Sequence, residues 1–270
     1  MKGLHYGILF MLLIGCKTKS DNKDSMTTLL DDNKNFSEQI LVNSKPDSIT
    51  VDIARTAVIV VDMENDFCSK GGLMDKLGID LSVVRSIIEP TKTFLTAARK
   101  ANIPIIYLKM GFQPDLSDLG AKELAIRERF YGIVGDTVTS PNGDIGRLLI
   151  RETWNTDIIS EIKPQTNDIV IYKTRFSGFY ETQLDSILKS KAIKFLIVIG
   201  CTTSVCVEST VRDAMFRDYF AIVLEDCTAE PDGIDLARSN YEASLFIIQS
   251  ELGWVSNSRE FMKAFNSVIR

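Results

Sequence analysis

The chain has 270 residues, a formal net charge of −5, 45% hydrophobic residues and 25% charged residues. This is the composition of an ordinary globular protein, and it excludes a disordered, collagen-like or coiled-coil chain. The acidic balance gives no indication of a nucleic-acid partner, because such proteins usually present a basic face. Five cysteines in a chain of this length are too few for a disulfide scaffold.

The single histidine, His5, lies in a segment that we interpret as a removable leader. A mature protein without histidine cannot use Ser-His-Asp or Cys-His catalysis, and it cannot hold zinc through imidazole. Acid–base chemistry must then come from Asp, Glu, Lys, Cys or Tyr. We therefore expect no metal and no cofactor.

Residues 1–15 are predicted to be a lipoprotein signal peptide. Lys2 precedes an apolar stretch, Tyr6–Gly15, which has about half of the ~20 residues that a membrane-spanning helix needs. The stretch ends in Leu-Ile-Gly followed by Cys16, which resembles the bacterial lipobox, where the cysteine is lipidated and becomes the mature N-terminus. A plain cleaved signal, or a buried N-terminal helix with a chance cysteine, is the alternative. The order of charge, apolar stretch, small residue and cysteine favours an exported lipoprotein anchored to a membrane, on its periplasmic or cell-surface face.

Residues 16–51 are predicted to be a polar tether that carries the lipid on Cys16. The segment is rich in Lys, Asp, Asn, Ser and Thr and has few aromatic residues, so it cannot bury enough apolar surface to order itself. The folded domain is expected over 52–270, and no internal repeat is visible.

Within that domain, apolar runs alternate with segments of helical spacing. Ala57–Val61 is a continuous run rich in β-branched residues, which is typical of a strand buried on both faces. The other expected strands are Ile103–Leu108, Ile169–Tyr172, Phe195–Ile199 and Ala221–Leu224. The expected helices are Leu81–Lys100, Thr182–Lys189, Val205–Phe216 and Leu236–Gln249.

This alternation predicts a single doubly wound α/β domain, in which helices flank a mainly parallel sheet. The stretch 111–155 has no clear strand, and we expect it to be an insertion of helices and loops over one end of the sheet.

Three reactive side chains follow the expected strands. In such sheets ligands bind beyond the carboxyl ends of the strands. Asp62 follows the first run, Lys173 follows Ile169–Tyr172, and the turn Gly200–Cys206 follows Phe195–Ile199. We therefore expect an acid, an amine and a thiol to meet at one edge of the sheet.

Together these groups can carry out acyl transfer. A helix N-terminus and the Lys173 cation would favour the Cys206 thiolate, which attacks an amide-like carbonyl carbon. Asp62 would accept the thiol proton and later protonate the leaving nitrogen. The backbone N–H groups of Val205 and Cys206 would face the developing oxyanion. A thioester forms and is then hydrolysed.

Each residue also has an ordinary structural explanation. A lone cysteine in an apolar helix is usually a small buried hydrophobe, an Asp after a strand commonly caps a helix or forms a turn, and a Lys at a strand end is usually solvated. All three at strand ends of one domain without histidine favours the catalytic interpretation.

Three segments carry a resemblance to a known family: Val61–Phe67, Lys173–Phe179 and Gly200–Asp213 resemble the three motifs of the isochorismatase-like cysteine hydrolases. The similarity runs from about residue 55 to 266. It is most specific to the branch of ureidoacrylate amidohydrolases and biuret hydrolases, on Arg175–Phe179, Val205–Asp213, Val223–Asp226 and Gly253–Val255.

The resemblance implies a Rossmann-like fold, the catalytic triad Asp62, Lys173 and Cys206, and a cis peptide bond at Cys201–Thr202. It also implies a homo-oligomer and a small amide or carbamoyl substrate.

The chain departs from the ureidoacrylate pattern around the expected pocket. Met110-Gly111-Phe112 stands where that branch has Asn-Gly-Trp, and Phe67 and Phe176 stand where it has tyrosines. The substrate pocket is expected to include Phe67, Phe112, Phe176 and Phe179, unless these aromatic residues belong to the core. A pocket that lacks a polar partner discriminates against a substrate that needs one. We therefore expect weak ureidoacrylate hydrolysis and a preference for a less polar amide or N-carbamoyl compound.

Three functions remain in competition. The first is metal-free hydrolysis of a C–N bond through Cys206. The second is isochorismatase-type vinyl-ether hydrolysis, which Cys206 argues against, because isochorismatase proper lacks this nucleophile. The third is a catalytically idle surface lipoprotein that binds a ligand or partner. Nicotinamidase relatives hold a metal with histidine and aspartate, and this chain cannot supply the histidine.

Lipidation of Cys16 is the first testable expectation, because Cys16 ends a lipobox-like segment and the polar tether that follows would place the domain off the membrane surface. Mass spectrometry of the protein from its native membrane should find Cys16 as a lipidated N-terminus. An unmodified chain that begins at Met1 in the cytosol would contradict the anchor.

The second testable expectation is that chelation of metal ions does not affect activity. EDTA should leave turnover unchanged, because no imidazole and no closely spaced thiolates are available as ligands. Activity that disappears on chelation and returns with zinc or manganese would show that the site depends on a metal.

Overall fold

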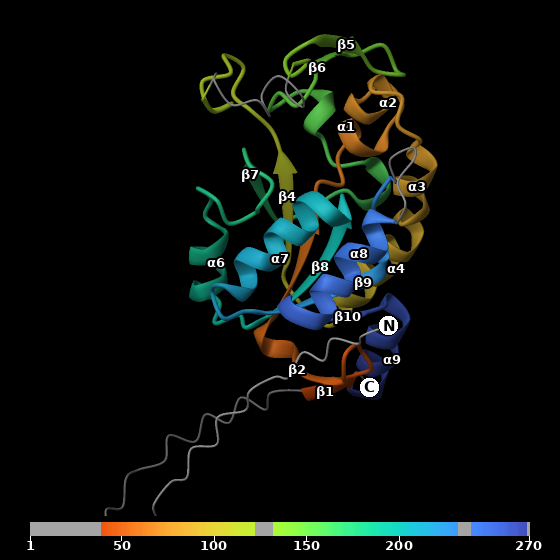
Figure 1. Cartoon of the computed structure of the whole chain (residues 1–270), viewed down its shortest axis with the longest axis vertical. Coiled ribbons are helices and arrows are strands. Elements are labelled where there is room, and N and C mark those ends of the chain that lie inside the picture. Colours follow the sequence, from red (N-terminus) through yellow and green to blue (C-terminus); the bar gives the residue numbers. More distant parts are fainter. Residues whose placement is uncertain (1–38, 122–131, 232–238, 269–270) are drawn as a thin grey trace, which may run out of the picture. The chain divides into compact units, whose positions relative to one another are not determined.

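A computed structural model of the protein describes residues 39–121, 132–231 and 239–268, and Figure 1 shows its architecture. These residues all belong to one unit, Ser37–Arg270. The signal peptide, Cys16 and the first part of the expected tether lie outside the described residues. Within the described ranges, no helix is both long enough and apolar enough to cross a membrane.

A sheet of six parallel strands forms the centre of the fold. Its spatial order is β7-β4-β3-β8-β9-β10. The strands are β3 (Thr56–Val61), β4 (Ile105–Met110), β7 (Ile169–Lys173), β8 (Phe195–Cys201), β9 (Phe220–Ala229) and β10 (Trp254–Ser256). Numbered along the chain, this is the order 3-2-1-4-5-6 of a doubly wound fold, whose direction of winding reverses between the first and fourth strands. The switch point therefore lies between β3 and β8, and the predicted fold class is confirmed.

Helices cover both faces of the sheet. Alternate residues of β3 point to opposite faces, so that Val58 and Val60 join one core while Ala57, Ile59 and Val61 join the other. The first core packs against α3 (Leu81–Ser86), α4 (Ile88–Lys100) and α9 (Ser258–Val268). The second packs against α6 (Leu184–Ser190), α7 (Glu208–Met215) and α8 (Asn240–Ile247), and α7 and α8 lie in front of the sheet in Figure 1.

Two expected helices are interrupted. The helix expected over Leu81–Lys100 breaks at Ile87, because Pro90 has no N–H to donate to residue 86 and fits only in the first turn of α4. The helix expected over Val205–Phe216 begins instead with a π-helical turn, Thr203–Val207, in which the Val207 N–H donates to the Thr202 carbonyl at 3.1 Å. Such turns are frequent at functional sites. Of Leu236–Gln249, α8 and the start of a second π-turn (Ile248–Leu252) are described, and 232–238 lies outside the described residues.

The second half of the expected tether is folded. β1 (Gln39–Val42) and β2 (Ile49–Asp52) form an antiparallel hairpin, so the domain begins near residue 39 rather than 52. Ile40, Val42 and Val51 are buried in the core beside α9. Composition misses this hairpin because inward- and outward-pointing residues alternate along each strand, so that few residues are buried and apolar Leu41 itself points outward.

The insertion contains a short hairpin that the apolar runs do not predict. β5 (Thr137–Thr139) pairs antiparallel with β6 (Ile145–Arg147). These three-residue strands are too short to give a hydrophobic pattern. Beyond them the loop 148–150 returns to the sheet edge, where the Phe112 N–H donates to the Leu149 carbonyl at 2.8 Å.

The Asp66 carboxylate links this loop to two short helices, α1 (Asn65–Cys68) and α2 (Leu73–Lys76). It accepts hydrogen bonds from the Leu73 N–H at 2.9 Å, the Asn155 side-chain amide at 2.7 Å and the Leu149 N–H at 2.5 Å. Burial raises the pKa of Asp66 to about 6, against the opposing effect of these donors. Asp66 therefore fixes three separate segments that surround the same end of the sheet.

Replacing Asp66 with Asn should lower the free energy of unfolding by about 1–3 kcal/mol, because an amide nitrogen cannot accept the bonds that one carboxylate oxygen accepts. Folding raises the pKa of Asp66 in the wild type. Its contribution to the free energy of unfolding is therefore fully present below pH 3.8 and is lost as the pH rises through about 6. Urea unfolding at a series of pH values should show this loss in the wild type and not in Asp66→Asn. Identical pH profiles for the two proteins would contradict the assignment.

Candidate active site

Asp62, Lys173 and Cys206 meet at the carboxyl edge of the sheet, at the switch point. Asp62 follows β3, Lys173 ends β7, and Cys206 lies in the π-turn after β8. The Lys173 Nζ lies 2.7 Å from Asp62 Oδ2 and donates to Cys206 Sγ at 3.4 Å. The convergence expected from the strand ends is therefore present.

The backbone near the switch point fixes the acid. Asp62 has a left-handed φ of +51°, and its N–H donates to the Leu108 carbonyl at 2.9 Å. Gly200 approaches β3 so closely that a Cβ would lie 2.1 Å from the Val61 carbonyl oxygen, so only glycine fits. The Cys201–Thr202 peptide bond that follows is cis, and the Cys201 thiol donates to the Asp62 carbonyl at 3.3 Å.

Lys173 is the centre of the site. Its ammonium group is fully buried, and besides Asp62 and Cys206 it contacts the Arg175 carbonyl at 3.3 Å and Met110 Sδ at 3.5 Å. Burial alone would lower the pKa of Lys173, but the Asp62 carboxylate and the Cys206 thiol outweigh it and raise the pKa. Lys173 is thus held as a cation between the acid and the nucleophile.

Burial lowers the pKa of an ammonium group but raises that of a thiol, and Cys206 shows the second effect. It raises the pKa of the Cys206 thiol well above its ordinary value, and the Asp62 carboxylate raises it further, while Lys173 opposes both. Lys173 thus acts in the expected direction, but desolvation outweighs the cation, so the net shift of the Cys206 pKa is upward and not downward. Burial also raises the pKa of Asp62, against the effect of Lys173. The resting site holds a thiol next to a carboxylate that can take its proton.

The backbone N–H groups of Val205 and Cys206, both expected to face an oxyanion, differ in whether they are free to do so. The Val205 N–H donates to the Thr202 carbonyl at 3.2 Å, so it is already used within the turn. The Cys206 N–H belongs to the residue that carries the nucleophile, as an oxyanion donor often does.

Cys206 opens into a pocket of about 340 Å³. Two of the four aromatic residues expected there, Phe67 and Phe176, line it together with Met110. Phe112 and Phe179 do not line the pocket: Phe112 is fully buried beneath the insertion, and Phe179 stacks on Tyr219 in the core. The remaining lining residues are Leu73, Met74, Leu77, Ile79, Leu149, Thr202, Val205, Glu230 and Pro231. Strand-end position alone does not reveal the apolar contribution of α2.

Glu64 is a buried acid three residues past the end of β3, and its position relative to the strand does not mark it as a site residue. It lies between Asp62 and Asp66 in the chain, and its carboxyl oxygens accept no hydrogen bond from the described residues. Burial, together with the negative charges of Asp62 and Asp66, raises its pKa well above the ordinary value. Glu64 therefore favours the neutral, protonated form.

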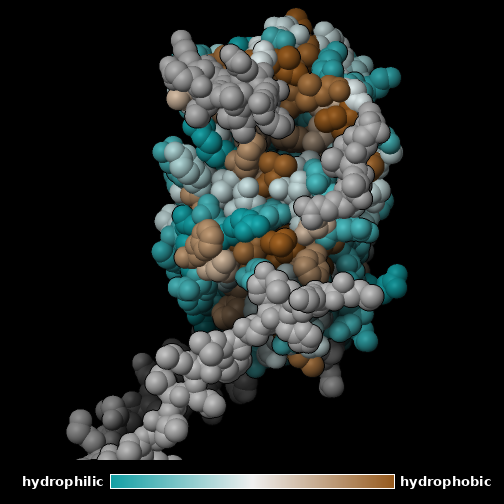
Figure 2. Space-filling model, viewed as in Figure 1, coloured by the Kyte–Doolittle hydropathy of each residue, from teal (hydrophilic) through white to brown (hydrophobic). Residues whose placement is uncertain are grey.

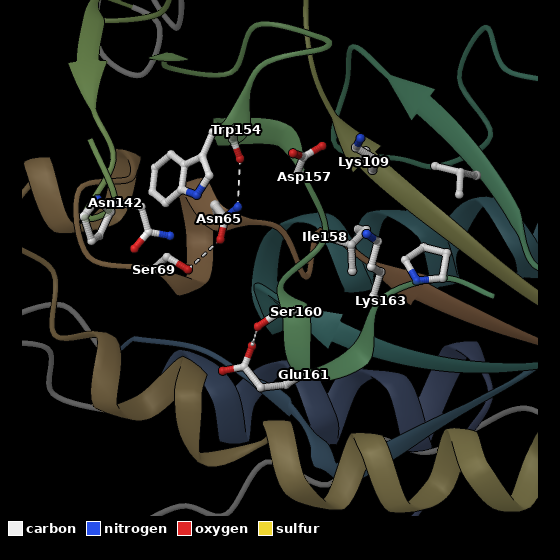
Figure 3. Close-up of a pocket in the computed structure, with 13 residues that line it drawn as sticks. Asn65, Ser69, Lys109, Asn142, Trp154, Asp157, Ile158, Ser160, Glu161 and Lys163 are labelled. Carbon is white, nitrogen blue, oxygen red and sulfur yellow. Dashed lines mark hydrogen bonds between the residues drawn. The ribbon is translucent and has the colours of Figure 1, made fainter. Parts of the chain in front are cut away.

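A larger hollow of about 580 Å³ lies on the other side of α1 and β4, and Figure 3 shows it. Lys109 faces this hollow while its neighbour Met110 faces the Cys206 pocket, as alternation along a strand requires. Asn65 donates to the Trp154 carbonyl at 2.8 Å across it, and neither Asp62, Lys173 nor Cys206 lines it. We place the chemistry in the smaller pocket, because Cys206, which lies beside Lys173 and Asp62, lines that pocket and not the larger hollow.

No group of three His, Cys, Asp or Glu side chains in the described part of the chain is arranged to hold a metal ion.

Comparison of sequences identifies relatives over nearly the whole domain. The isochorismatase domain family matches residues 56–260. The chain is 39% identical to the ureidoacrylate amidohydrolase RutB of Yersinia enterocolitica, over 82% of this chain and 94% of that protein. It is 36% identical to the RutB of Caulobacter segnis, over 85% of this chain and 93% of that one.

Solved structures give the same grouping. A cysteine hydrolase from Pseudomonas syringae pv. phaseolicola superposes with a TM-score of 0.68 at 30% identity, over 80% of this chain and 95% of that one. The N-carbamoylsarcosine amidase of Thermoplasma acidophilum superposes with a TM-score of 0.56 at 25% identity, over 76% and 96% of the two chains. With a matching fold, a matching domain and relatives above 30% identity, this chain belongs to the isochorismatase family of hydrolases.

Proposed function

We propose that this protein is a metal-independent cysteine hydrolase that cleaves a C–N bond of a small amide or carbamoyl compound. The observation that carries the proposal is the shared position of Lys173, whose ammonium group lies 2.7 Å from Asp62 and 3.4 Å from the Cys206 sulfur. The relatives that are amidohydrolases and a carbamoyl amidase support the same reaction class.

In the first half of the reaction, the Asp62 carboxylate takes the Cys206 proton as the sulfur attacks the carbonyl carbon. Lys173 stabilises the negative charge on the sulfur, which the burial of the site would otherwise disfavour. The tetrahedral intermediate then collapses: the C–N bond breaks, Asp62 returns the proton to the leaving nitrogen, and a thioester remains on Cys206.

In the second half, Asp62 takes a proton from water, and the resulting hydroxide attacks the thioester carbonyl. The C–S bond breaks and the sulfur leaves with the proton that Asp62 holds. The sum is an amide plus water giving a carboxylic acid plus an amine; from a carbamoyl compound the acid product is a carbamate, which decomposes to CO₂.

Vinyl-ether hydrolysis and ligand binding without turnover are the competing functions. Neither requires a nucleophile, yet Cys206 lines the pocket, while Cys68, Cys201 and Cys227 are fully buried elsewhere. Iodoacetamide should therefore label Cys206 ahead of the other three thiols.

A panel of biuret, ureido acids, N-carbamoyl amino acids and aryl amides, assayed for ammonia and CO₂ release, tests the reaction class directly. Release from any member supports C–N hydrolysis. No release from any member, together with an unreactive Cys206, would favour the binding protein instead.

The roles of the triad are tested on whichever panel member is hydrolysed. Cys206→Ala should abolish turnover, because it removes the covalent step, and Asp62→Asn should slow thioester formation by orders of magnitude. Lys173→Met should move iodoacetamide labelling of Cys206 to higher pH, because the cation that opposes burial is gone.

Cys227→Ala is the matched control for Cys206→Ala. It removes a fully buried thiol that lies outside the pocket, and it should keep turnover. Near-normal rates in Cys206→Ala would contradict the mechanism. A single change at Asp62 or Lys173 leaves a buried charge without its partner, so circular dichroism should accompany those assays.

A further inference from the structure

The pocket at Cys206 is apolar almost throughout. Ten of its thirteen lining residues have aliphatic, thioether or aromatic side chains, and α2 with the segment that follows it contributes four of them: Leu73, Met74, Leu77 and Ile79. Figure 2 shows hydrophobic residues gathered over α1 and α2 at this end of the molecule. The volume of the Cys206 pocket, about 340 Å³, is at the lower end of the ~300–1,000 Å³ usual for ligand pockets.

Apart from the catalytic groups, one described charged residue lines the pocket, and it is an acid. Glu230 directly follows β9, and its carboxylate accepts a hydrogen bond from the Ser204 N–H at 2.8 Å. Ser204 belongs to the π-turn that carries Cys206. The negative charge of Glu230 is therefore held next to the nucleophile's turn.

Three cations of the described residues lie near the pocket, and each is paired or turned away from it. Lys173 is paired with Asp62. The Arg175 guanidinium donates to the Thr174 and Asp118 carbonyls, and Lys109 faces the other hollow. Thus no described basic side chain is placed to receive a carboxylate in this pocket.

We propose that the pocket selects amides or carbamoyl compounds whose flanking group is apolar and uncharged, and that Glu230 excludes substrates with a carboxylate. An acid bound here would lose its hydration against apolar walls and would meet a like charge. The binding free energy comes instead from burial of a hydrocarbon group. This inference rests on the proposed function and adds its substrate class.

Two matched pairs of substrates test it, each with equal carbon number. Hexanamide is compared with adipamate, the same chain with a terminal carboxylate, and N-butylurea is compared with 4-ureidobutanoate. In the pair that is hydrolysed, kcat/KM for the acid should be lower by about 100-fold. Among shorter neutral homologues, kcat/KM should rise by about fourfold for each CH₂ until the pocket is filled.

Glu230→Gln separates the charge of Glu230 from its hydrogen bond, because the amide oxygen can still accept from Ser204. It should raise the kcat/KM ratio of acid to neutral substrate by about tenfold. Glu225→Gln is the control: it removes a charge from β9, five residues before Glu230, at a residue that does not line the pocket, and it should leave that ratio unchanged.

The outcomes distinguish the two proposals. Equal or better hydrolysis of the acids, or a ratio that Glu230→Gln does not move, would overturn the substrate class and leave the C–N hydrolase in place. If no member of either pair or of the wider panel is hydrolysed and Cys206 is unreactive, the proposed function itself fails.

Discussion

The ion pair between Lys173 and Asp62 is the constraint on which the site depends. Both side chains are fully buried and 2.7 Å apart. Removing two charges from water costs several kcal/mol per ion, and a hydrophobic pair of the same volume is often at least as stable. Such a pair is weak evidence for stability, so its presence here points to chemistry. Lys173 also contacts the sulfur, so the pair that neutralises the acid supports the nucleophile.

Three acids at alternate positions, Asp62, Glu64 and Asp66, show how environment divides their roles. All are buried, and burial raises the pKa of each. Asp62 forms an ion pair with Lys173 and Asp66 accepts three hydrogen bonds, whereas the Glu64 carboxyl oxygens accept no hydrogen bond from the described residues. In the proposed mechanism Asp62 exchanges a proton with the substrate, while Asp66 holds α2 and the 149 loop in place around the pocket. Chemistry and pocket shape are thus set within five consecutive residues.

The sequence predicts the parts that depend on local pattern. Five strands of the sheet are visible as apolar runs, and their carboxyl ends locate Asp62, Lys173 and Cys206. It cannot predict what depends on tertiary burial. The thiol pKa is one such property, because desolvation outweighs the neighbouring cation. The positions of Phe112 and Phe179 are another, since an aromatic residue after a strand can enter the core or the pocket with the same local pattern. The position of Glu230 at a strand end is not visible in the sequence, because β9 continues five residues past the apolar run Ala221–Leu224.

The β1–β2 hairpin and the triad lie at opposite ends of the central sheet. The hairpin connects through Asp52 to the amino end of β3, and Lys45 bridges to β10. The hairpin therefore lies at the end of the sheet opposite the edge that carries the triad, as Figure 1 shows. The polypeptide enters the domain at this far end. The Cys206 pocket therefore lies at the end of the sheet opposite to the one where the described chain begins.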